Sequence, residues 1–230
     1  MKQGRKNIVI AIDGPAASGK GTLARALAER LDFAYMDTGA LYRAVAFAVL
    51  RAGGDCALES EALIGCERLQ EELRGPQGLG VLSNPLLRSE AVAEGASVVA
   101  AFPSVREALV SIQRGFAEKP GKGFRGSVLD GRDIGTVICP QADVKLFVTA
   151  QTEIRAERRR KELQSKGIEA KYEAVLADMR NRDERDSGRK AAPLRPADDA
   201  VVLDTTGLSA AAVLETALQV VEETLNRSCL

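Results

Sequence analysis

The chain has 230 residues, of which 45% are hydrophobic and 28% are charged, as is typical of a globular protein with a sizeable core. Its 32 basic residues balance 32 acidic ones, which excludes a wholly basic nucleic-acid-binding protein. Histidine is absent, so imidazole acid-base catalysis, Ser-His nucleophiles and His-containing zinc sites are excluded as well.

The predicted elements alternate between strands and helices along the chain. The continuous apolar run from Ile8 to Ile12 is typical of a strand that is buried on both faces of a parallel sheet. We expect further strands at 33–36, 128–130, 144–148 and 200–203. Helical periodicity covers residues 23–31, 40–52, 103–118, 152–165, 171–185 and 209–226. This alternation predicts an α/β fold with a central parallel sheet.

Two regions depart from this alternation. Between about 55 and 100 the sequence predicts small helical pieces and a Gly/Pro/Asn-bearing stretch, which we interpret as an inserted substrate-binding subdomain. Residues 151–195 carry 13 basic and 9 acidic residues, whereas 198–230 carries one basic and six acidic residues. The zero net charge therefore conceals a polarised chain.

The cysteines and the apolar segments indicate the compartment. Cys56, Cys66, Cys139 and Cys229 form no C-x-x-C pair, so we expect reduced thiols. The N-terminal apolar run is too short for a signal peptide, and no apolar stretch is long enough to span a bilayer. We therefore expect a cytoplasmic protein that makes no contact with membranes.

The strongest motif lies where the first strand ends and the first helix begins. Glycines there let the backbone aim successive N–H groups at phosphate oxygens, and Lys20 reaches the terminal phosphates, which predicts a triphosphate site. The alternative is a glycine-rich turn that caps an ordinary helix. Gly21 stands between Lys20 and Thr22, where the strict pattern has Ser or Thr, so the magnesium ligands stay unknown. The loop residues are Gly14, Pro15, Ala16, Ala17, Ser18, Gly19, Lys20, Gly21 and Thr22.

Two polar segments follow other predicted strands. Residues 37–43, DTGALYR, open a helix with Thr38 as a plausible N-cap, and residues 130–133 read DGRD. Both would lie at the carboxyl edge of the sheet, where open α/β folds bind ligands. The alternatives are a simple helix cap at Asp37 and Thr38, and a surface ion pair of Arg132 with Asp133. Likewise, Arg182, Arg185 and Arg189 could form a solvated helix face.

Six motifs occur in order over positions 14 to 196: GPAASGKGT, MDTGALYR, AAFPSVREAL, DGRDIGT, RDERDSGR and APL. Together they resemble the bacterial-type cytidylate kinases, which are P-loop nucleoside monophosphate (NMP) kinases. The resemblance implies one kinase domain over 1–230, with a parallel sheet flanked by helices, an NMP-binding insert and a short helical lid. The implied core covers about 1–54, 101–150 and 196–230, the insert about 55–100, and the lid with its arginine-rich region about 151–195. The serine usual in the family is Thr38 here, and the insert stretch GLGVLSNPLLRSEAV looks shorter than in many relatives.

The resemblance also implies the roles of individual residues. It implies a cytosine pocket of Thr38, Arg106, Asp133 and Arg189, with Ser97, Arg182 and Asp186 near the sugar, Arg43 and Arg132 toward the phosphate, and Tyr42 among the substrate-binding residues. The implied catalytic groups are Lys20, Arg132, Arg158 and Arg159. The arginine run at 155, 158, 159 and 160 suits a helical lid, and Arg155, Arg158 and Arg159 share one face. The alternative is a water-exposed helix on which Glu157 and Glu162 pair locally.

The expected activity is phosphoryl transfer from ATP to CMP, and to dCMP, with Mg²⁺, by a monomer that binds no nucleic acid. Such transfer needs positioning and charge neutralisation rather than acid-base groups, so the lack of histidine is no obstacle. The nearest alternative is a kinase for UMP, AMP or shikimate. A P-loop ATP-dependent RNA-binding regulator is supported only by the basic 151–195 segment, and the nine aromatic residues offer little for base stacking.

Overall fold

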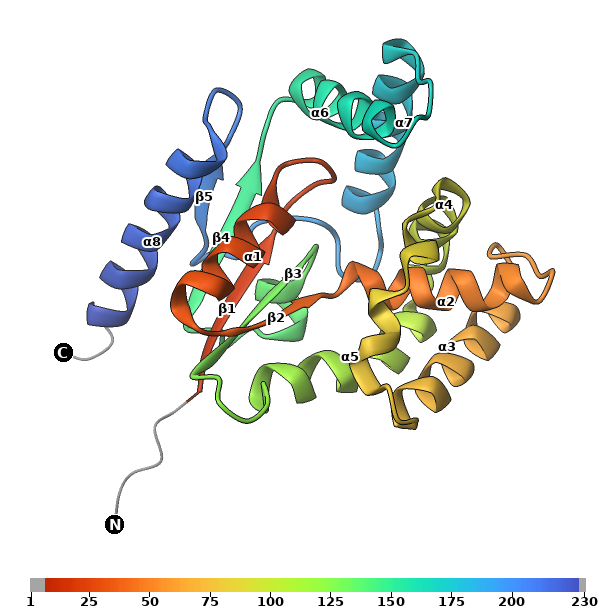
Figure 1. The fold of residues 1–230 in the computed structure, drawn as a ribbon, viewed down its shortest axis with the longest axis horizontal. Coiled ribbons are helices and arrows are strands. Elements are labelled where there is room, and N and C mark those ends of the chain that lie inside the picture. The colour runs from red at the N-terminus through yellow and green to blue at the C-terminus, as the bar shows by residue number, and fades with distance from the viewer. Residues whose placement is uncertain (1–6, 228–230) are drawn as a thin grey trace. The chain divides into compact units, whose positions relative to one another are not determined.

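The computed structural model describes residues 7–227, and Cys229 lies outside this range. The strands are β1 (Ile8–Asp13), β2 (Ala34–Asp37), β3 (Gly126–Gly131), β4 (Val144–Thr149) and β5 (Val201–Asp204), and they form one sheet in the order β2-β3-β1-β4-β5. The central strand β1 pairs in parallel with β3 and β4, and β4 pairs in parallel with β5. The predicted α/β class with a parallel sheet is confirmed (Figure 1).

The α-helices are α1 (Lys20–Leu31), α2 (Gly39–Arg51), α3 (Glu59–Arg74), α4 (Glu90–Val99), α5 (Pro103–Glu118), α6 (Thr152–Ser165), α7 (Tyr172–Ser187) and α8 (Ala210–Arg227). Two 3₁₀ turns, η1 (Gly78–Ser83) and η2 (Pro85–Arg88), and one π-helical turn, η3 (Ile134–Ile138), complete the fold. The 16-residue α3 is longer than the small helical pieces that the sequence predicts for 55–100. Its buried positions are Ala62, Gly65, Cys66 and Leu69, and three such small side chains give a weak apolar period.

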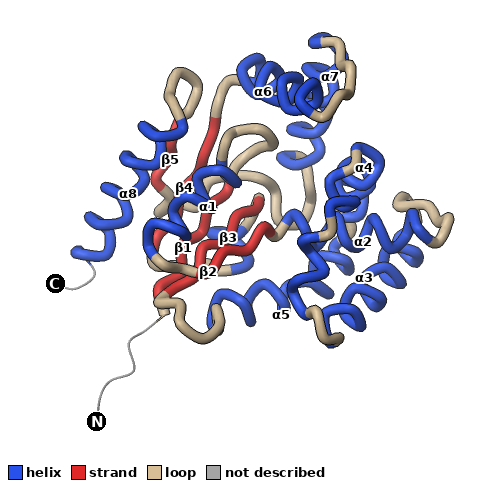
Figure 2. The backbone as a smooth tube through the Cα atoms, in the orientation of Figure 1, coloured by secondary structure: helices blue, strands red, loops and turns tan. Residues whose placement is uncertain are grey.

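The chain forms two compact units. The sheet unit extends to Met36 and resumes at Arg114, and the helical unit covers Asp37–Gln113, a range that includes 55–100. Figure 2 shows helices and loops, and almost no strand, over the helical unit. In the sheet unit, α1 and α8 pack against each other and against the sheet, around buried residues such as Ile10, Leu27 and Leu146. This core fixes β1, and with it the start of the glycine-rich loop.

The described cysteines are unbonded thiols, namely Cys56, Cys66 and Cys139. Burial raises the pKa of both Cys66 and Cys139 to about 11, so neither is a reactive thiolate near neutral pH.

Between residues 7 and 227, no single helix is long and apolar enough to cross a membrane. The consecutive helices α4 and α5 reach that length and composition only together, and a bend of 102° separates them.

The helical unit depends on a close approach between α2 and α3 at Gly65. A Cβ atom built on Gly65 would lie 2.9 Å from the Val45 carbonyl oxygen and 3.0 Å from Val49 Cγ2. We predict that Gly65→Ala destabilises the protein, because overpacking costs about 1–3 kcal/mol, whereas the gain in helix propensity is at most about 1 kcal/mol. Urea unfolding measures the difference.

Gly115→Ala is the matched control, because Gly115 is a helical glycine of α5 with no atom within 4 Å of the added Cβ. It is expected to stabilise the protein by up to about 1 kcal/mol. If Gly65→Ala were as stable as the wild-type protein, or more stable, the predicted close packing would be contradicted.

Candidate active site

The glycine-rich loop connects β1 to α1, as the sequence predicts. Gly14 has φ +151°, and a Cβ atom there would lie 2.0 Å from the Val148 carbonyl oxygen of β4, so only glycine fits. Ala17 and Gly19 also have positive φ values, 58° and 90°. The backbone therefore turns tightly before Lys20 begins α1, in the way that phosphate-cradling loops require.

The loop is fixed from behind by groups that lie far away in the sequence. Thr205 Oγ1 donates to the Ser18 carbonyl oxygen at 2.9 Å, and the Ser18 side chain is fully buried. Arg158 donates two hydrogen bonds to Thr205. Its Nη1 donates to the Thr205 Oγ1 atom at 2.9 Å, and its Nη2 donates to the Thr205 carbonyl oxygen at 2.6 Å. Its Nη1 lies 4.0 Å from an ideal Cβ position on Gly19. The predicted catalytic residue Arg158 thus lies against the loop.

A cavity of about 410 Å³ adjoins the same loop. Ser18, Thr22 and Arg158 line one side, and apolar side chains of α1 and α8, such as Leu23 and Leu214, line the rest. An apolar cavity with one guanidinium beside a phosphate loop suits a flat, uncharged ring that is attached to a phosphate chain.

The departure at Gly21 has a steric cause. A Cβ atom on Gly21 would lie 3.0 Å from Asp130 Oδ2, which is tighter than a normal contact. Asp130 is buried at the end of β3. A serine or threonine in place of Gly21 would displace this carboxylate, so the loop presents a carboxylate oxygen near the position of the missing hydroxyl.

Four predicted substrate residues come together in the sheet unit. Asp186 of α7 accepts from Arg132 Nε at 2.8 Å and also pairs with Arg189. Burial alone would raise the pKa of Asp186, but Arg132, Arg189 and Arg182 outweigh it and hold that pKa below its usual value. By contrast, Arg185 is exposed on α7, as the solvated-face alternative has it.

Positive charge exceeds negative charge in this cluster, in which Arg132, Arg182 and Arg189 face Asp186. Desolvation, followed by repulsion from Arg132, lowers the pKa of Arg182 to about 10. The Nε atom of Arg182 is buried and has no hydrogen-bond partner among the described residues. A buried donor left unsatisfied costs about 1–3 kcal/mol, so an anion with acceptor oxygens would stabilise the cluster.

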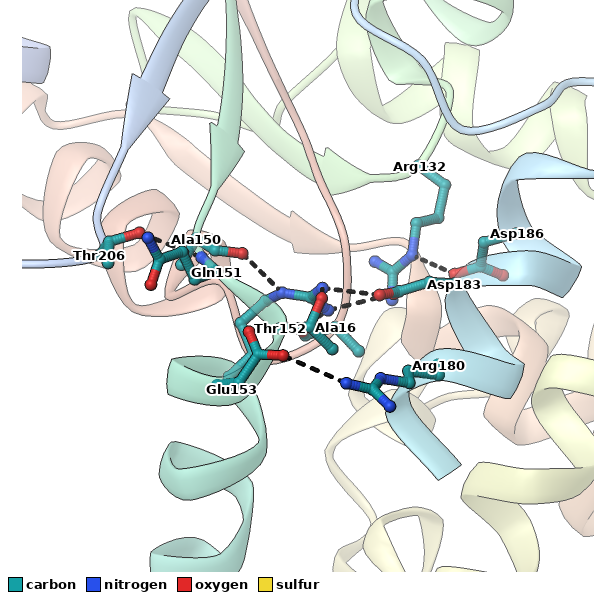
Figure 3. A network of polar contacts seen from close by, with 11 residues as sticks. Ala16, Arg132, Ala150, Gln151, Thr152, Glu153, Arg180, Asp183, Asp186 and Thr206 are labelled. Carbon is teal, nitrogen blue, oxygen red and sulfur yellow. Dashed lines mark hydrogen bonds and ion pairs between the residues drawn. The ribbon is translucent and has the colours of Figure 1, made fainter. Parts of the chain in front are cut away.

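The arginine run on α6, which the sequence assigns to a helical lid, divides into different roles. Arg155 is buried and donates to the carbonyl oxygens of Ala150 and Ala16 at 2.9 and 3.3 Å, and to Asp183 at 2.6 and 3.1 Å (Figure 3). It therefore ties the phosphate loop to α7 instead of facing solvent. Arg160 pairs with Glu157, as the local-pairing alternative predicts.

Arg159 makes an ion pair on its own helix and also acts electrostatically on α7. It pairs with Glu162 at 2.9 Å, and its charge also acts on Arg182. The spacing of the run reveals a shared face, but it does not reveal the distant partners of Arg155 and Arg158, which are Asp183, Ala16 and Thr205.

The helical unit holds the other predicted acceptor residues. Arg106 is buried with its guanidinium 5.5 Å from the centroid of the Tyr42 ring, and its Nη1 donates to the Ala100 carbonyl oxygen at 3.3 Å. Arg43 Nη2 donates to Asp37, while Arg43 Nε and Ser97 Oγ are buried without a hydrogen-bond partner among residues 7–227. These donors are available to a polar ligand.

Thr38 occupies the predicted N-cap position of α2, but its side chain does not cap the helix. Thr38 directly precedes α2 but has helical backbone angles, φ −67° and ψ −24°, and its side chain makes no capping hydrogen bond. An N-cap side chain reaches the first turn from an extended backbone, which Thr38 lacks. Thr38 is 3% exposed, so its side chain is buried instead of facing solvent.

Asp13 is a polar residue whose importance the sequence does not reveal. It ends β1, is 5% exposed, and accepts from the backbone N–H groups of Ile134 and Gly135, both at 2.7 Å. Desolvation raises the pKa of Asp13 to about 7, against these hydrogen bonds and the nearby Arg132, and Asp133 adds to the rise. Its partners are main-chain groups, which leave no side-chain pattern in the sequence.

This raised pKa predicts how stability depends on pH. Between about pH 4 and 7 the folded state holds a proton on Asp13 that the unfolded state has lost, so the free energy of unfolding falls as pH rises, by up to about 1.4 kcal/mol per unit. Asp13→Asn removes this dependence. Urea unfolding of both proteins from pH 5 to 9 should give a stability difference that changes below pH 7 and is constant above it. A difference that is constant over the whole range would contradict the raised pKa.

Known proteins resemble the chain over most of its length. A protein-family model described as cytidylate kinase matches residues 10–223. The cytidylate kinase of Rhodospirillum rubrum is 54% identical over 213 residues, which cover 93% of this chain and 96% of that protein. The cytidylate kinase of Methylocella silvestris is 55% identical over 215 residues, 94% of each chain.

A crystal structure of an uncharacterized protein from Eubacterium ventriosum aligns with a TM-score of 0.52 over 95% of this chain and 99% of that chain. At 13% identity, this likeness concerns the fold alone. On the family match and the identity with these relatives, the chain belongs to the cytidylate kinase family.

Proposed function

We propose that the protein transfers a phosphoryl group from ATP to CMP, and to dCMP, to give ADP and CDP or dCDP. The observation that carries this proposal is the cluster of Arg132, Arg182 and Arg189 around the Asp186 carboxylate, in the same unit as a phosphate-cradling loop. Both features suit anionic ligands, and relatives more than 50% identical are named cytidylate kinases.

The loop between β1 and α1 is the proposed ATP site. Residues 14–22 would bind the phosphates through backbone N–H groups, the helix N-terminus and Lys20. The adjoining cavity of about 410 Å³ would take the adenine ring, with Arg158 between ring and phosphates. The buried Ser18 Oγ, which has no partner among residues 7–227, supports a polar ligand at this loop.

We assign the CMP contacts to two groups of residues, each within its own unit. In the helical unit, the proposed NMP-binding part with 55–100 inside it, Thr38 and Arg106 would contact the base, Ser97 the sugar and Arg43 the phosphate, with Tyr42 under the Arg106 guanidinium. In the sheet unit, Asp133 and Arg189 would contact the base, Arg182 and Asp186 the sugar, and Arg132 the phosphate. Guanidinium donors match the O2 and N3 acceptors of cytosine, and a carboxylate matches its amino group.

The proposed reaction needs no general base. A phosphate oxygen of CMP, already ionised, attacks the γ-phosphorus of ATP, and the bond from that phosphorus to the β–γ bridging oxygen breaks, so the oxygen leaves with ADP. Lys20, Arg132, Arg158 and Arg159 would neutralise the charge that spreads over the transferring group. The 151–195 region, with α6 and α7, would act as the lid that excludes water.

Magnesium, if bound, would supply positive charge that neutralises the phosphate oxygens. Asp130, with Oδ2 beside Gly21, offers the carboxylate oxygen that Mg²⁺ prefers, and Thr22 offers a hydroxyl in the same loop. Among the described residues there is no group of three or more Cys, Asp or Glu side chains that could hold a metal alone. These residues fit an ion held by one carboxylate and by substrate phosphates.

A coupled ADP-release assay with CMP, dCMP, UMP, AMP and shikimate tests the proposal. We expect kcat/KM for CMP to exceed the value for UMP by at least about 100-fold, because UMP leaves several buried donors facing its N3–H group. The controls are ATP without acceptor and inactivated protein. Faster turnover of UMP, AMP or shikimate than of CMP would replace the proposed acceptor.

Arg106→Met tests the base contact. Losing a charge-assisted hydrogen bond should raise the KM for CMP by about 10–100-fold and leave the KM for ATP within about threefold. Arg51→Met is the matched control, because Arg51 lies 6.0 Å over the Phe47 ring in the same unit and has no proposed role. Equal losses for both substrates would refute the assignment of Arg106 to the acceptor.

A further inference from the structure

The segment that follows the DGRD motif is one π-helical turn, η3, and it is fixed at both ends. At its start, Asp13 Oδ1 accepts from Ile134 N and Oδ2 accepts from Gly135 N, both at 2.7 Å. Each carboxylate oxygen therefore has its own backbone donor. Asp13 is also level with Gly131 in the β1–β3 register, so it lies beside the residue that precedes Arg132.

Arg114 fixes the other end of the turn. Its Nε donates to the Ile138 carbonyl oxygen at 2.9 Å, and its Nη2 donates to the Val137 carbonyl oxygen at 3.0 Å. A carboxylate thus meets the N–H end of η3 and a guanidinium meets the carbonyl end, which are the charges that a helical turn favours at each end.

The turn begins directly after Arg132 and Asp133. The Asp133 carbonyl oxygen accepts from Val137 N at 2.9 Å and from Ile138 N at 3.1 Å, so the backbone of Asp133 is part of the turn. Asp133 has φ −146° and ψ 26°, which is neither helical nor extended. The direction of its side chain, and of the preceding Arg132, therefore depends on where the turn is held.

Glycine at 135 permits this arrangement. A Cβ atom on Gly135 would lie 3.1 Å from Lys145 Cδ and 3.4 Å from Asp13 Oδ2. The Lys145 ammonium donates to the Pro140 carbonyl oxygen at 2.7 Å and to Asp199 Oδ1 at 2.8 Å. These bonds hold the Lys145 side chain in place beside Gly135. The carboxylate of Asp13 reaches the two N–H groups because no side chain separates them.

We infer that Asp13 and Arg114 are positioning residues that clamp η3 from its two ends and thereby orient Arg132 and Asp133 toward the acceptor nucleotide. Neither residue touches a substrate, and both act through the backbone of 132–138. This inference rests on the proposed function, because it assigns the clamp to CMP and not to ATP.

Asp13→Asn and Arg114→Met test the clamp from opposite ends. Asparagine would place an NH₂ group against one of the two N–H donors, and methionine would remove both donors to the carbonyl oxygens. At pH 8, each variant should raise the KM and the calorimetric Kd for CMP about tenfold, while those for ATP stay within about twofold. Arg114→Lys keeps a cation near the same carbonyl oxygens, so it should lose less affinity for CMP than Arg114→Met.

Two matched controls separate the clamp from a general loss of stability. Asp143→Asn changes a carboxylate that accepts from Val9 N, at 2.9 Å, at the other end of β1. Arg68→Met removes a guanidinium that donates to the Ala48 carbonyl oxygen at 3.3 Å in the helical unit. Both controls should leave the ratio of the two Kd values unchanged, even where thermal unfolding shows that they destabilise the protein.

The outcomes are distinguishable. If wild-type protein transfers phosphate to CMP but both clamp variants bind CMP normally, or lose CMP and ATP affinity equally, the clamp is overturned and the proposed function stands. If wild-type protein neither binds nor phosphorylates CMP, both proposals are overturned. Should Asp13→Asn fail to fold, Arg114→Met decides alone, because Arg114 is exposed and its replacement leaves the core intact.

Discussion

The parallel pairing of β1 with β3 and β4 is the constraint on which the sheet unit depends. In this register Asp13 is level with Gly131 on one side and with Phe147 on the other, so three strands end at the same edge. The glycine-rich loop follows β1, Arg132 and Asp133 follow β3, and α6 begins shortly after β4. Residues more than a hundred positions apart therefore meet at one edge without any long connection, as is general for open α/β sheets.

The sheet unit also holds several arginine and aspartate side chains that are partly removed from water. Arg132, Arg182 and Arg189 share Asp186 of α7, and Arg155 of α6 is neutralised by Asp183, also on α7. Desolvating such groups is costly unless each donor finds an acceptor, and Arg155 achieves this whereas Arg182 Nε does not. Within the packed helices α6 and α7, a fully paired guanidinium therefore lies near one whose Nε has no partner among the described residues.

Elements with strong local patterns could be predicted from the sequence, whereas side chains whose hydrogen-bond partners are backbone groups could not. The strand before Gly14 and the helix after Lys20 have strong local patterns, and the fold class follows from their alternation with later elements. The length of α3 was underestimated because three of its four buried residues are the small Ala62, Gly65 and Cys66. Thr38 occupies the expected N-cap position, but a capping hydrogen bond depends on backbone angles that the sequence does not reveal. The role of Asp13 depends on distant backbone N–H groups, and that of Arg155 on distant carbonyl oxygens and on Asp183. Main-chain groups leave no side-chain pattern in the sequence.

The hydrogen bond from Thr205 to Ser18 joins residues 187 positions apart, and Arg158 completes the same junction. A ribosome makes the glycine-rich loop within the first tenth of the chain but supplies Thr205 only near the end. During synthesis the loop therefore exists for most of the time without the hydroxyl that fixes its backbone, and its contact with β4 must also wait for residue 148. The first motif to leave the ribosome is thus among the last to reach its final shape, so a nascent or truncated chain would display the motif before it could hold a nucleotide.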